Sequence, residues 1–452
     1  MSAISLDISP QRNGQGRARM PSSRTRPKLH SRTWHKPALP KLNISTTHTP
    51  STFRKTLMLE PQPYDLVVLS SYGGPEGQED VIPFLRNATA GRGIPDERLE
   101  EVAVHYRANG GVSPINAQNR ALRAALEQAL SERGPVLPVH WGNRNWHPYV
   151  TDVLRDAYAA GHRNILVLPT SAYPGYSSDR QYREDWGMAL ENLEAAGEIE
   201  PGSVHIAKIP PFFAADGLAV AFADGVQASL EQVLPAVAER VGAENAIERT
   251  RILFCTHSIP VTSYEDLEAG KERYEGGHAY VEKHLQNARK IMALLAERDE
   301  RLAAIEWELV YQSRSGPPQM PWLEPDVNDR LEELEGQIDG VIMVPLGFIS
   351  AHMEVQWDLD TEALDTCARL GIIAQRSATP DTHPAFVESL RELIAQRVAG
   401  TAESAAVDLA QRAHVCSPAA SPVSAASWDE DDCTTLCCKP LRGFSKTMVD
   451  NH

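Results

Sequence analysis

The stretch DLVVLSS at Asp65–Ser71 runs directly into Tyr72-Gly73-Gly74-Pro75. A short apolar run that ends at a Gly-Pro turn is typical of a buried strand. Outward from it, the first half of the chain predicts further strands at 135–141 and 164–170, and helices at 114–134, 150–161 and 180–197. Strands that alternate with helices predict a parallel sheet covered on both faces.

The second half of the chain repeats this alternation. It predicts strands at 250–256, 307–312 and 340–346, and helices at 277–302, 326–336 and 360–371. We therefore predict an α/β protein with two similar open doubly wound domains, each with a parallel sheet, at 61–235 and 236–399. Ligands of such folds bind between domains and beyond the carboxyl ends of strands, so the active site is expected in the cleft between the two.

The two ends of the chain differ from the rest in composition. Residues 1–57 hold 11 Lys and Arg and a single acid, Asp7, with no helical or strand period. We expect 1–60 to be a disordered extension, or upstream sequence translated ahead of a start at Met58, with a transit peptide as the alternative. Residues 400–452 form a polar tail that contains cysteines.

Composition narrows the class of protein. The net charge of −16 argues against a nucleic-acid partner, because phosphate binding needs a basic surface. The longest apolar runs, such as 66–69 and 165–168, are far shorter than the ~20 residues of a membrane-spanning helix. We expect a cytoplasmic protein without a transmembrane segment. No phosphate loop and no Gly-x-Ser-x-Gly occurs, so no nucleotide cofactor and no serine nucleophile elbow are predicted.

Polar side chains gather where the predicted strands end, and His257 is one of them. It follows an apolar strand in the run Cys255-Thr256-His257-Ser258-Ile259-Pro260. Such a histidine is either satisfied by the backbone at the strand end or able to accept a proton and bind a transition metal. Residue types and spacing leave both alternatives open.

Glu354 presents a second choice. It lies four residues before Asp358 in a run of carboxylates, so both point along one face if a helix starts here. Its carboxylate either complements the dipole at a helix start or relays protons and helps to hold a cation. A proton route from Glu354 would lead toward Asp358 and Asp360.

An ordered set of motifs resembles the ferrochelatase family, in the branch that metallates coproporphyrin III. The resemblance runs from about residue 64 to 399. The matching segments are SYGGP at 71–75, HY at 105–106 followed by GGVSPIN at 110–116, QYRED at 181–185, HSIP at 257–260, YQSRSG at 311–316, WLEPDV at 322–327 and HMEV at 352–355.

The resemblance implies a chelatase-like fold that inserts Fe(II) into coproporphyrin III in haem biosynthesis and releases two protons. It implies His257 as the metal-site histidine and Glu354 as its acidic partner, both catalytic. It implies porphyrin contacts by Ser113, Tyr182, Tyr72, Tyr106, His105 and Arg92. Porphyrin and ferrous iron are the expected partners, together with neighbouring enzymes of the haem pathway. A protoporphyrin ferrochelatase, a cobalt chelatase and a non-catalytic haem carrier are the alternatives.

Some relatives in this family bind a [2Fe–2S] cluster through three tail cysteines and one cysteine before Gln-Tyr-Arg-Glu-Asp. Here that loop reads Ser177-Ser178-Asp179 and holds no cysteine. A cluster is therefore an open alternative, either from the tail alone or with Asp179 in place of one thiolate. The candidate tail ligands are Cys416, Cys433, Cys437 and Cys438.

Overall fold

The computed structural model describes residues 57–58, 63–261, 279–314, 319–399 and 401–402. All of these residues belong to one compact unit. The expectations for residues 1–56 and for the tail from 403 onward lie outside the described residues. Within the predicted extension 1–60, β1 (Leu57–Met58) pairs antiparallel with β10 (Thr401–Ala402).

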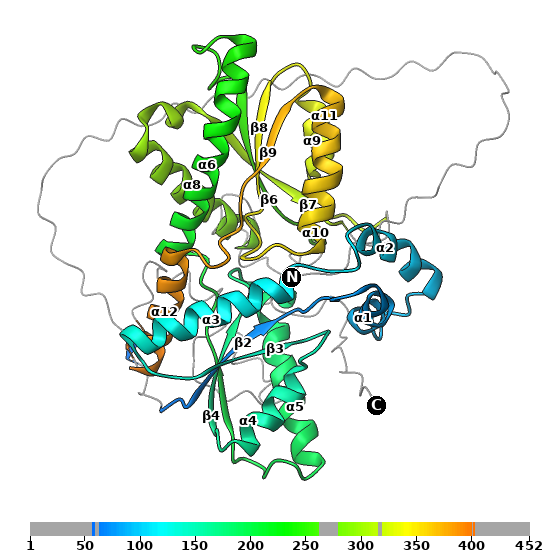
Figure 1. Ribbon diagram of the computed structural model, residues 1–452, viewed down its shortest axis with the longest axis vertical. Coiled ribbons are helices and arrows are strands. Elements are labelled where there is room, and N and C mark those ends of the chain that lie inside the picture. The colour runs from blue at the N-terminus through cyan, green and yellow to red at the C-terminus, as the bar shows by residue number, and fades with distance from the viewer. Residues whose placement is uncertain (1–56, 59–62, 262–278, 315–318, 400, 403–452) are drawn as a thin grey trace, which may run out of the picture. The chain divides into compact units, whose positions relative to one another are not determined.

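The first parallel sheet has the strand order β3-β2-β4-β5. Its strands are β2 (Leu66–Ser71), β3 (Val139–Asn143), β4 (Asn164–Pro169) and β5 (His205–Lys208). Along β2, Val67 and Leu69 join the core that holds the leucines of α3 (Ile115–Arg133), whereas Leu66 and Val68 join the core of α4 (Val150–Ala159) and α5 (Gln181–Ala195). The sheet is thus covered on both faces (Figure 1), as the continuous apolar run predicted.

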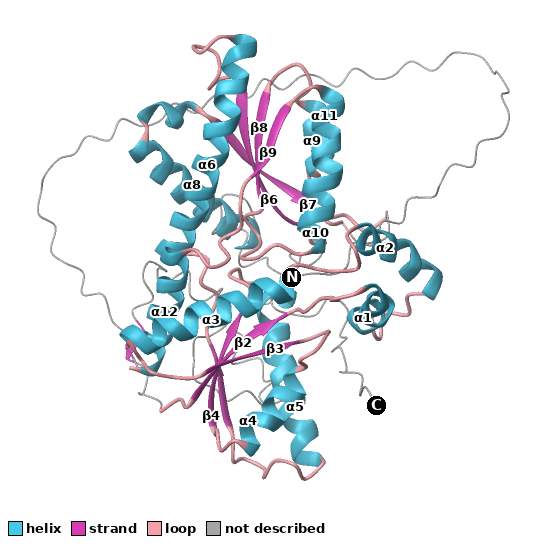
Figure 2. Cartoon of the chain, in the orientation of Figure 1, coloured by secondary structure: helices cyan, strands magenta, loops and turns pink. Residues whose placement is uncertain are grey.

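The second sheet has the equivalent order, β7-β6-β8-β9, and is also fully parallel. Its strands are β6 (Thr250–His257), β7 (Glu306–Gln312), β8 (Gly340–Val344) and β9 (Ile373–Arg376). Ile252 and Phe254 pack with α6 (Asp216–Val241) and α8 (Ala279–Arg298). Leu253 and Cys255 pack on the other face, with α9 (Val327–Glu333) and α11 (Leu364–Leu370). Two similar doubly wound parallel sheets are therefore present, as predicted (Figure 2).

The shared strand order places the strands that open each half, β2 and β6, in the middle of their sheets. From β2 the chain runs to β3 on one side of the sheet and then crosses to β4 on the other side. Ligands bind beyond the carboxyl ends of the strands at such a switch point. Tyr72 directly follows β2, and His257 is the last residue of β6. The topology alone therefore marks both residues as candidates for the site.

Several elements are absent from the sequence prediction. They include α1 (Val81–Ala88), α2 (Asp96–Ala108) and α12 (Pro384–Val398). The helices α1 and α2 build a small core of their own, which Met353 from the second half enters. The predicted boundary between residues 235 and 236 falls inside α6, and the two-domain division stays a prediction.

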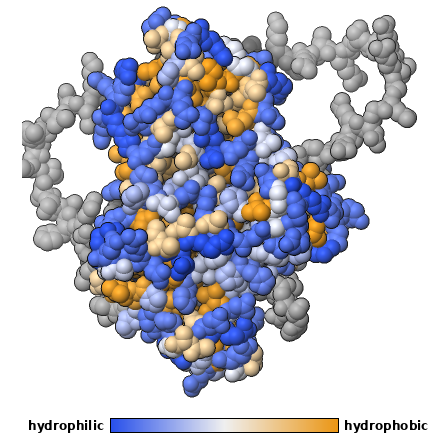
Figure 3. Space-filling model, in the orientation of Figure 1, coloured by the Kyte–Doolittle hydropathy of each residue, from blue (hydrophilic) through white to orange (hydrophobic). Residues whose placement is uncertain are grey.

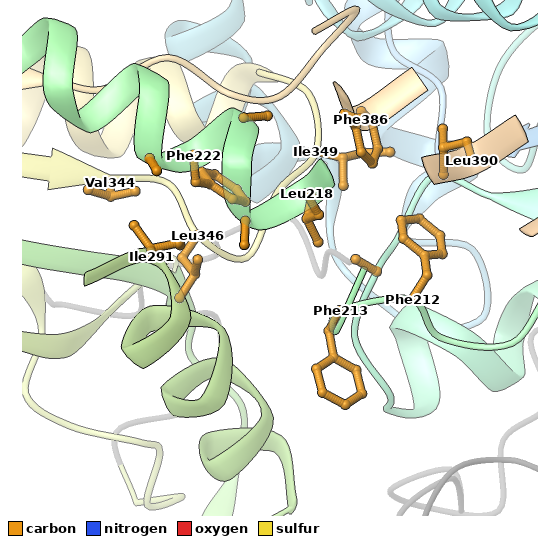
Figure 4. Packing of buried hydrophobic residues seen from close by; sticks show 14 of the residues in the cluster. Phe212, Phe213, Leu218, Phe222, Ile291, Val344, Leu346, Ile349, Phe386 and Leu390 are labelled. Atoms are coloured by element: carbon orange, nitrogen blue, oxygen red, sulfur yellow. The ribbon is translucent and has the colours of Figure 1, made fainter. Parts of the chain in front are cut away.

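One continuous core links the two sheets. The helix α12 packs on α6 and on α3, and Arg133 forms an ion pair with Glu388 at 2.9 Å. In Figure 4, Phe212 and Leu218 lie toward Phe386 and Leu390, and Phe222 lies toward Val344 and Leu346. The helix α12 therefore packs back on the first half of the chain.

The remaining helical segments are short and frame the strand ends. They are η1 (Gln78–Asp80), the π-helical turn η2 (Tyr176–Arg180), η4 (Glu300–Ala304), α10 (Met353–Val355) and the π-helical η5 (Gln356–Ala363). The helix predicted at 360–371 thus continues a helical run that already begins at Met353.

The surface gives no sign of a bilayer span. None of the helices in the described ranges combines the length and the apolar character that crossing a membrane requires. On the face in view in Figure 3, hydrophobic residues are scattered among hydrophilic ones.

Candidate functional site

His257 is the last residue of β6, and its contact with the backbone is visible in the structure. Its Nδ1 makes a hydrogen bond with the carbonyl oxygen of Ser258. A carbonyl can only accept, so Nδ1 carries the proton and Nε2 is the basic nitrogen of the neutral ring. The side chain is 7% exposed. The backbone contact therefore fixes the tautomer of the neutral ring, and the metal-site role of His257 stays a prediction.

Glu354 is the second residue of α10, and His352 is the N-cap residue of that helix. The backbone N–H of Glu354 donates to Nδ1 of His352 at 3.2 Å, and its carboxylate Oε2 lies 4.0 Å from the same nitrogen. Burial, and next the charge of His257, lower the pKa of His352 to about 3. His352 is thus a neutral ring with its proton on Nε2, close enough to His257 to influence it electrostatically. The sequence motif contained His352, but its role as a cap was not foreseen.

Asp358 lies four residues after Glu354, in η5. Ser313 Oγ and Gln312 Nε2 both donate to its Oδ2, the latter at 3.1 Å. Gln312 Nε2 also lies 3.3 Å from the carbonyl oxygen of Glu354. Burial raises the pKa of Asp358 to about 7, partly opposed by the Ser313 hydrogen bond. A buried carboxyl with a pKa near neutrality can both take and give a proton at physiological pH.

Asp360 has a different partner. Its carboxylate forms a two-pronged ion pair with Arg376 of β9, at 2.6 and 2.9 Å. The two carboxylates thus have different partners, and the proton route from Glu354 toward Asp358 and Asp360 stays a prediction.

Tyr72 and Tyr182 belong to a second group, around a buried arginine. The guanidinium of Arg144 lies 4.3 Å from the centre of the Tyr182 ring and forms an ion pair with Asp185. It also donates to Gln181 Oε1 at 3.0 Å. Burial raises the pKa of both tyrosines, and the positive charge of Arg144 opposes this rise. Sequence analysis missed Arg144 and its contact with Tyr182.

Tyr106 and Tyr72 connect the first half of the chain to Glu354. Burial raises the pKa of Tyr106, and the nearby carboxylates of Glu354 and Asp358 raise it further. Glu354 also acts on Tyr72, with Arg92 acting in the opposite direction. Tyr106 lies in one hydrophobic cluster with Met353, which precedes Glu354, and Tyr72 packs against that cluster.

The remaining predicted contacts come from α2 and the loop that follows it. His105 stacks on Trp357 with ring centres 4.0 Å apart and planes within 7°. Asn109 Nδ2 approaches Met353 Sδ at 3.6 Å. Ser113 is buried beside Gly74, where an added Cβ would meet the Ser113 Cβ at 2.7 Å. The structure therefore brings Ser113 close to the turn that carries Tyr72, and His105 against the acidic segment.

The candidate cluster ligands are not brought together within the described residues. Asp179 is 2% exposed and forms an ion pair with Lys208 of β5. The four tail cysteines lie outside the described ranges, and the two described cysteines, Cys255 and Cys367, are buried free thiols. In the part of the chain that the structure describes, no three His, Cys, Asp or Glu side chains are grouped to hold a metal ion.

The site is thus that of an α/β protein with two doubly wound parallel sheets. Tyr72 and His257 lie at the carboxyl ends of β2 and β6, and Gln312, which is paired with His257, donates to Asp358. The chain belongs to the ferrochelatase family, whose pattern it matches over residues 64–398.

Close relatives are similar over most of their length. A coproporphyrin III ferrochelatase from Leifsonia xyli is 46% identical over 86% of this chain and 95% of the relative. Those from Streptomyces griseus and Streptomyces coelicolor are 49% and 50% identical, each over 75% of this chain and 87% of the relative.

Proposed function

We propose that this chain inserts Fe(II) into coproporphyrin III and forms Fe-coproporphyrin III, the coprohaem of haem biosynthesis. The names and the extent of the relatives support this substrate. The observation that carries the proposal is the link through Gln312, which connects His257, Glu354 and Asp358. Gln312 is paired with His257 in the sheet, and its Nε2 donates to Asp358 Oδ2 and to the carbonyl oxygen of Glu354. Metal insertion needs groups that receive protons where the metal enters, and these three supply them.

The chemistry divides between distortion and proton transfer. A free porphyrin has two N–H protons that leave as the metal enters, and its lone pairs lie hidden in the ring plane. Binding that puckers the macrocycle exposes those lone pairs, so part of the binding energy distorts the substrate. His257 Nε2 takes a pyrrole proton or passes the metal, and Glu354 with Asp358 carries protons away from the ring centre.

The porphyrin contacts follow from the two groups around the site. Tyr72 offers aromatic surface to a flat macrocycle, with Ser113 beside the turn that carries it. Tyr106 and Tyr182 are buried and support this region from within. We infer that Arg92 and His105 contact the rim of the macrocycle, because both belong to the segment around α2. The propionate side chains of the substrate would find a cation in Arg92.

The alternatives are distinguished by particular features. A haem carrier needs an iron ligand but no proton relay. The hydrogen bonds from Ser313 and Gln312 to the buried Asp358 therefore favour an enzyme. A cobalt chelatase and a protoporphyrin ferrochelatase would use the same groups. Parallel rates with Fe(II) and Co(II), and with coproporphyrin III and protoporphyrin IX, decide between them. Ferrous iron with coproporphyrin III is expected to be fastest.

A substitution tests the role of His257. His257→Ala should abolish iron insertion, followed as the change in porphyrin absorption bands under anaerobic conditions, while porphyrin binding stays within about threefold. His205→Ala, which changes a partly buried histidine of β5, is the matched control and should retain activity. Activity of His257→Ala within tenfold of the parent would contradict the assignment.

Two finer expectations accompany this function. We expect the reaction to take place in the cytoplasm, beside the enzymes that supply the porphyrin and use its iron complex. The buried Asp179 is paired with Lys208, so it does not fit the part of a cluster ligand. Any [2Fe–2S] cluster would therefore rely on the cysteines of the tail.

A further inference from the structure

A second histidine lies behind the site, in a buried network that no step above uses. His284 is fully buried in α8, one turn after Tyr280. Its Nδ1 lies 2.8 Å from the carbonyl oxygen of Tyr280, and its Nε2 lies 2.9 Å from Thr256 Oγ1. Thr256 directly precedes His257 in β6.

The partners determine where every proton of this network lies. The Tyr280 carbonyl can only accept, so His284 Nδ1 donates and Nε2 of the neutral ring accepts. Thr256 must then donate its single hydroxyl proton to His284. The Tyr280 hydroxyl donates to the carbonyl oxygen of His257 at 3.0 Å and is shared with Thr256 Oγ1 at 2.9 Å. The network therefore ends on the backbone of His257.

Packing holds the His284 ring in one orientation. The ring stacks on Tyr173 with centres 3.7 Å apart and planes within 9°, and the Tyr173 hydroxyl accepts from Asn287 Nδ2 at 2.8 Å. Tyr280, His284 and Asn287 lie at i, i+4 and i+7 of α8, on one helical face. Tyr173 comes from the loop after β4. The network thus connects the end of β6, in the second half of the chain, to Tyr173 in the first half.

We propose that His284 is a positioning residue for metal insertion, acting through Thr256 and Tyr280 on the backbone carbonyl of His257. When its backbone carbonyl is held in this way, the His257 ring presents Nε2 to the porphyrin in a fixed direction. Loss of the hydrogen-bond acceptor at position 284 frees the end of β6 to shift. This inference rests on the proposed function. Outer partners of a metal-site histidine typically contribute about 10–100-fold to activity, and an effect through the backbone belongs at the lower end.

The test compares two substitutions of the same residue. His284→Phe keeps a flat ring against Tyr173 but removes both nitrogens, and it should lower kcat for iron insertion about tenfold with KM for porphyrin unchanged. His284→Gln restores an acceptor for Thr256 and should recover most of the rate. Tyr280→Phe removes the donor to His257 and should lower kcat similarly, with little further loss in the double variant with His284→Phe.

Controls separate this inference from packing and from the function itself. His205→Phe changes another histidine beside a tyrosine, Tyr64, with ring centres 6.3 Å apart, and should leave kcat unchanged. A His284→Phe enzyme within twofold of the parent, or equal losses in His284→Phe and His284→Gln, would overturn the inference. A parent protein that inserts no iron would instead overturn the proposed function, so the two failures are distinguishable.

Discussion

Asp358→Asn should stabilise the folded protein at alkaline pH and slow the enzyme. The pKa of this buried carboxyl is raised from 3.8 to about 7, chiefly by burial. Below about pH 4 the group is protonated in both the folded and the unfolded chain and affects stability little. Between about pH 4 and 7 only the folded state holds the proton, so the free energy of unfolding falls as pH rises.

The magnitude follows from the size of the shift. At about 1.4 kcal/mol for each pH unit, a shift of about 3 units corresponds to at most about 4 kcal/mol above pH 7. An asparagine has no charge to bury, and its carbonyl oxygen can accept the hydrogen bonds of Ser313 and Gln312 that Asp358 Oδ2 accepts now. The variant should therefore gain about 2–3 kcal/mol on the parent between pH 5 and pH 8.

The assay is reversible urea unfolding of both proteins at pH 5 and pH 8, beside the rate of iron insertion. We expect the stability difference to grow with pH, while kcat falls about 100-fold because a proton relay is lost. Equal pH dependence of unfolding in the two proteins would refute a raised pKa at Asp358. Full activity of the variant would refute its part in proton transfer.

Three further predictions concern other parts of the chain. Asp185→Asn should lower the free energy of unfolding, measured in urea, by about 3 kcal/mol, because it leaves Arg144 buried without its counter-charge. Both side chains of this ion pair are only 2% exposed. The double variant with Arg144→Met should be less destabilised. Protein purified without oxygen should carry iron and acid-labile sulfide in equal amounts and show the visible absorption of an iron–sulfur cluster. The double variant Cys437→Ser with Cys438→Ser should lose that absorption, and sulfide-free parent protein would contradict a cluster. Deleting residues 1–56 should leave the rate and the melting temperature nearly unchanged, since their composition cannot build a core, and a clear loss of either would contradict this.

The alternating pattern predicted most of the two sheets because their central strands are uniform. β2 and β8 are buried along their whole length, so the sequence reads as an apolar run. β5 escaped prediction because it is four residues long, HIAK, with a histidine and a lysine at its ends. α2 carries many charges, but its buried Leu99, Val102, Ala103 and Tyr106 follow a helical spacing that could have identified it.

The candidate site was predictable where it depends on strand ends and less so where it depends on side-chain partners. His257 and Tyr72 follow from their positions after β6 and β2, which hydrophobic periodicity already locates. Arg144 was missed because its partner Asp185 lies 41 residues away, and no local pattern records such a pair. Asp358 and Asp360 look alike in sequence, yet one accepts from Ser313 and the other pairs with Arg376.

Ser313 shows why the difference between these two carboxylates is a property of the fold. Its φ of 59° places a residue with a side chain in the left-handed region, which costs free energy unless neighbouring contacts hold it there. The hydrogen bond from its hydroxyl to Asp358 is such a contact, and it forms only because η5 brings the carboxyl to the end of β7. Burial of the carboxyl group at this position also raises the pKa of Asp358 to about 7. Backbone strain, burial and proton affinity are therefore linked at one point of the chain, where the proposed reaction needs a group that exchanges protons near neutral pH.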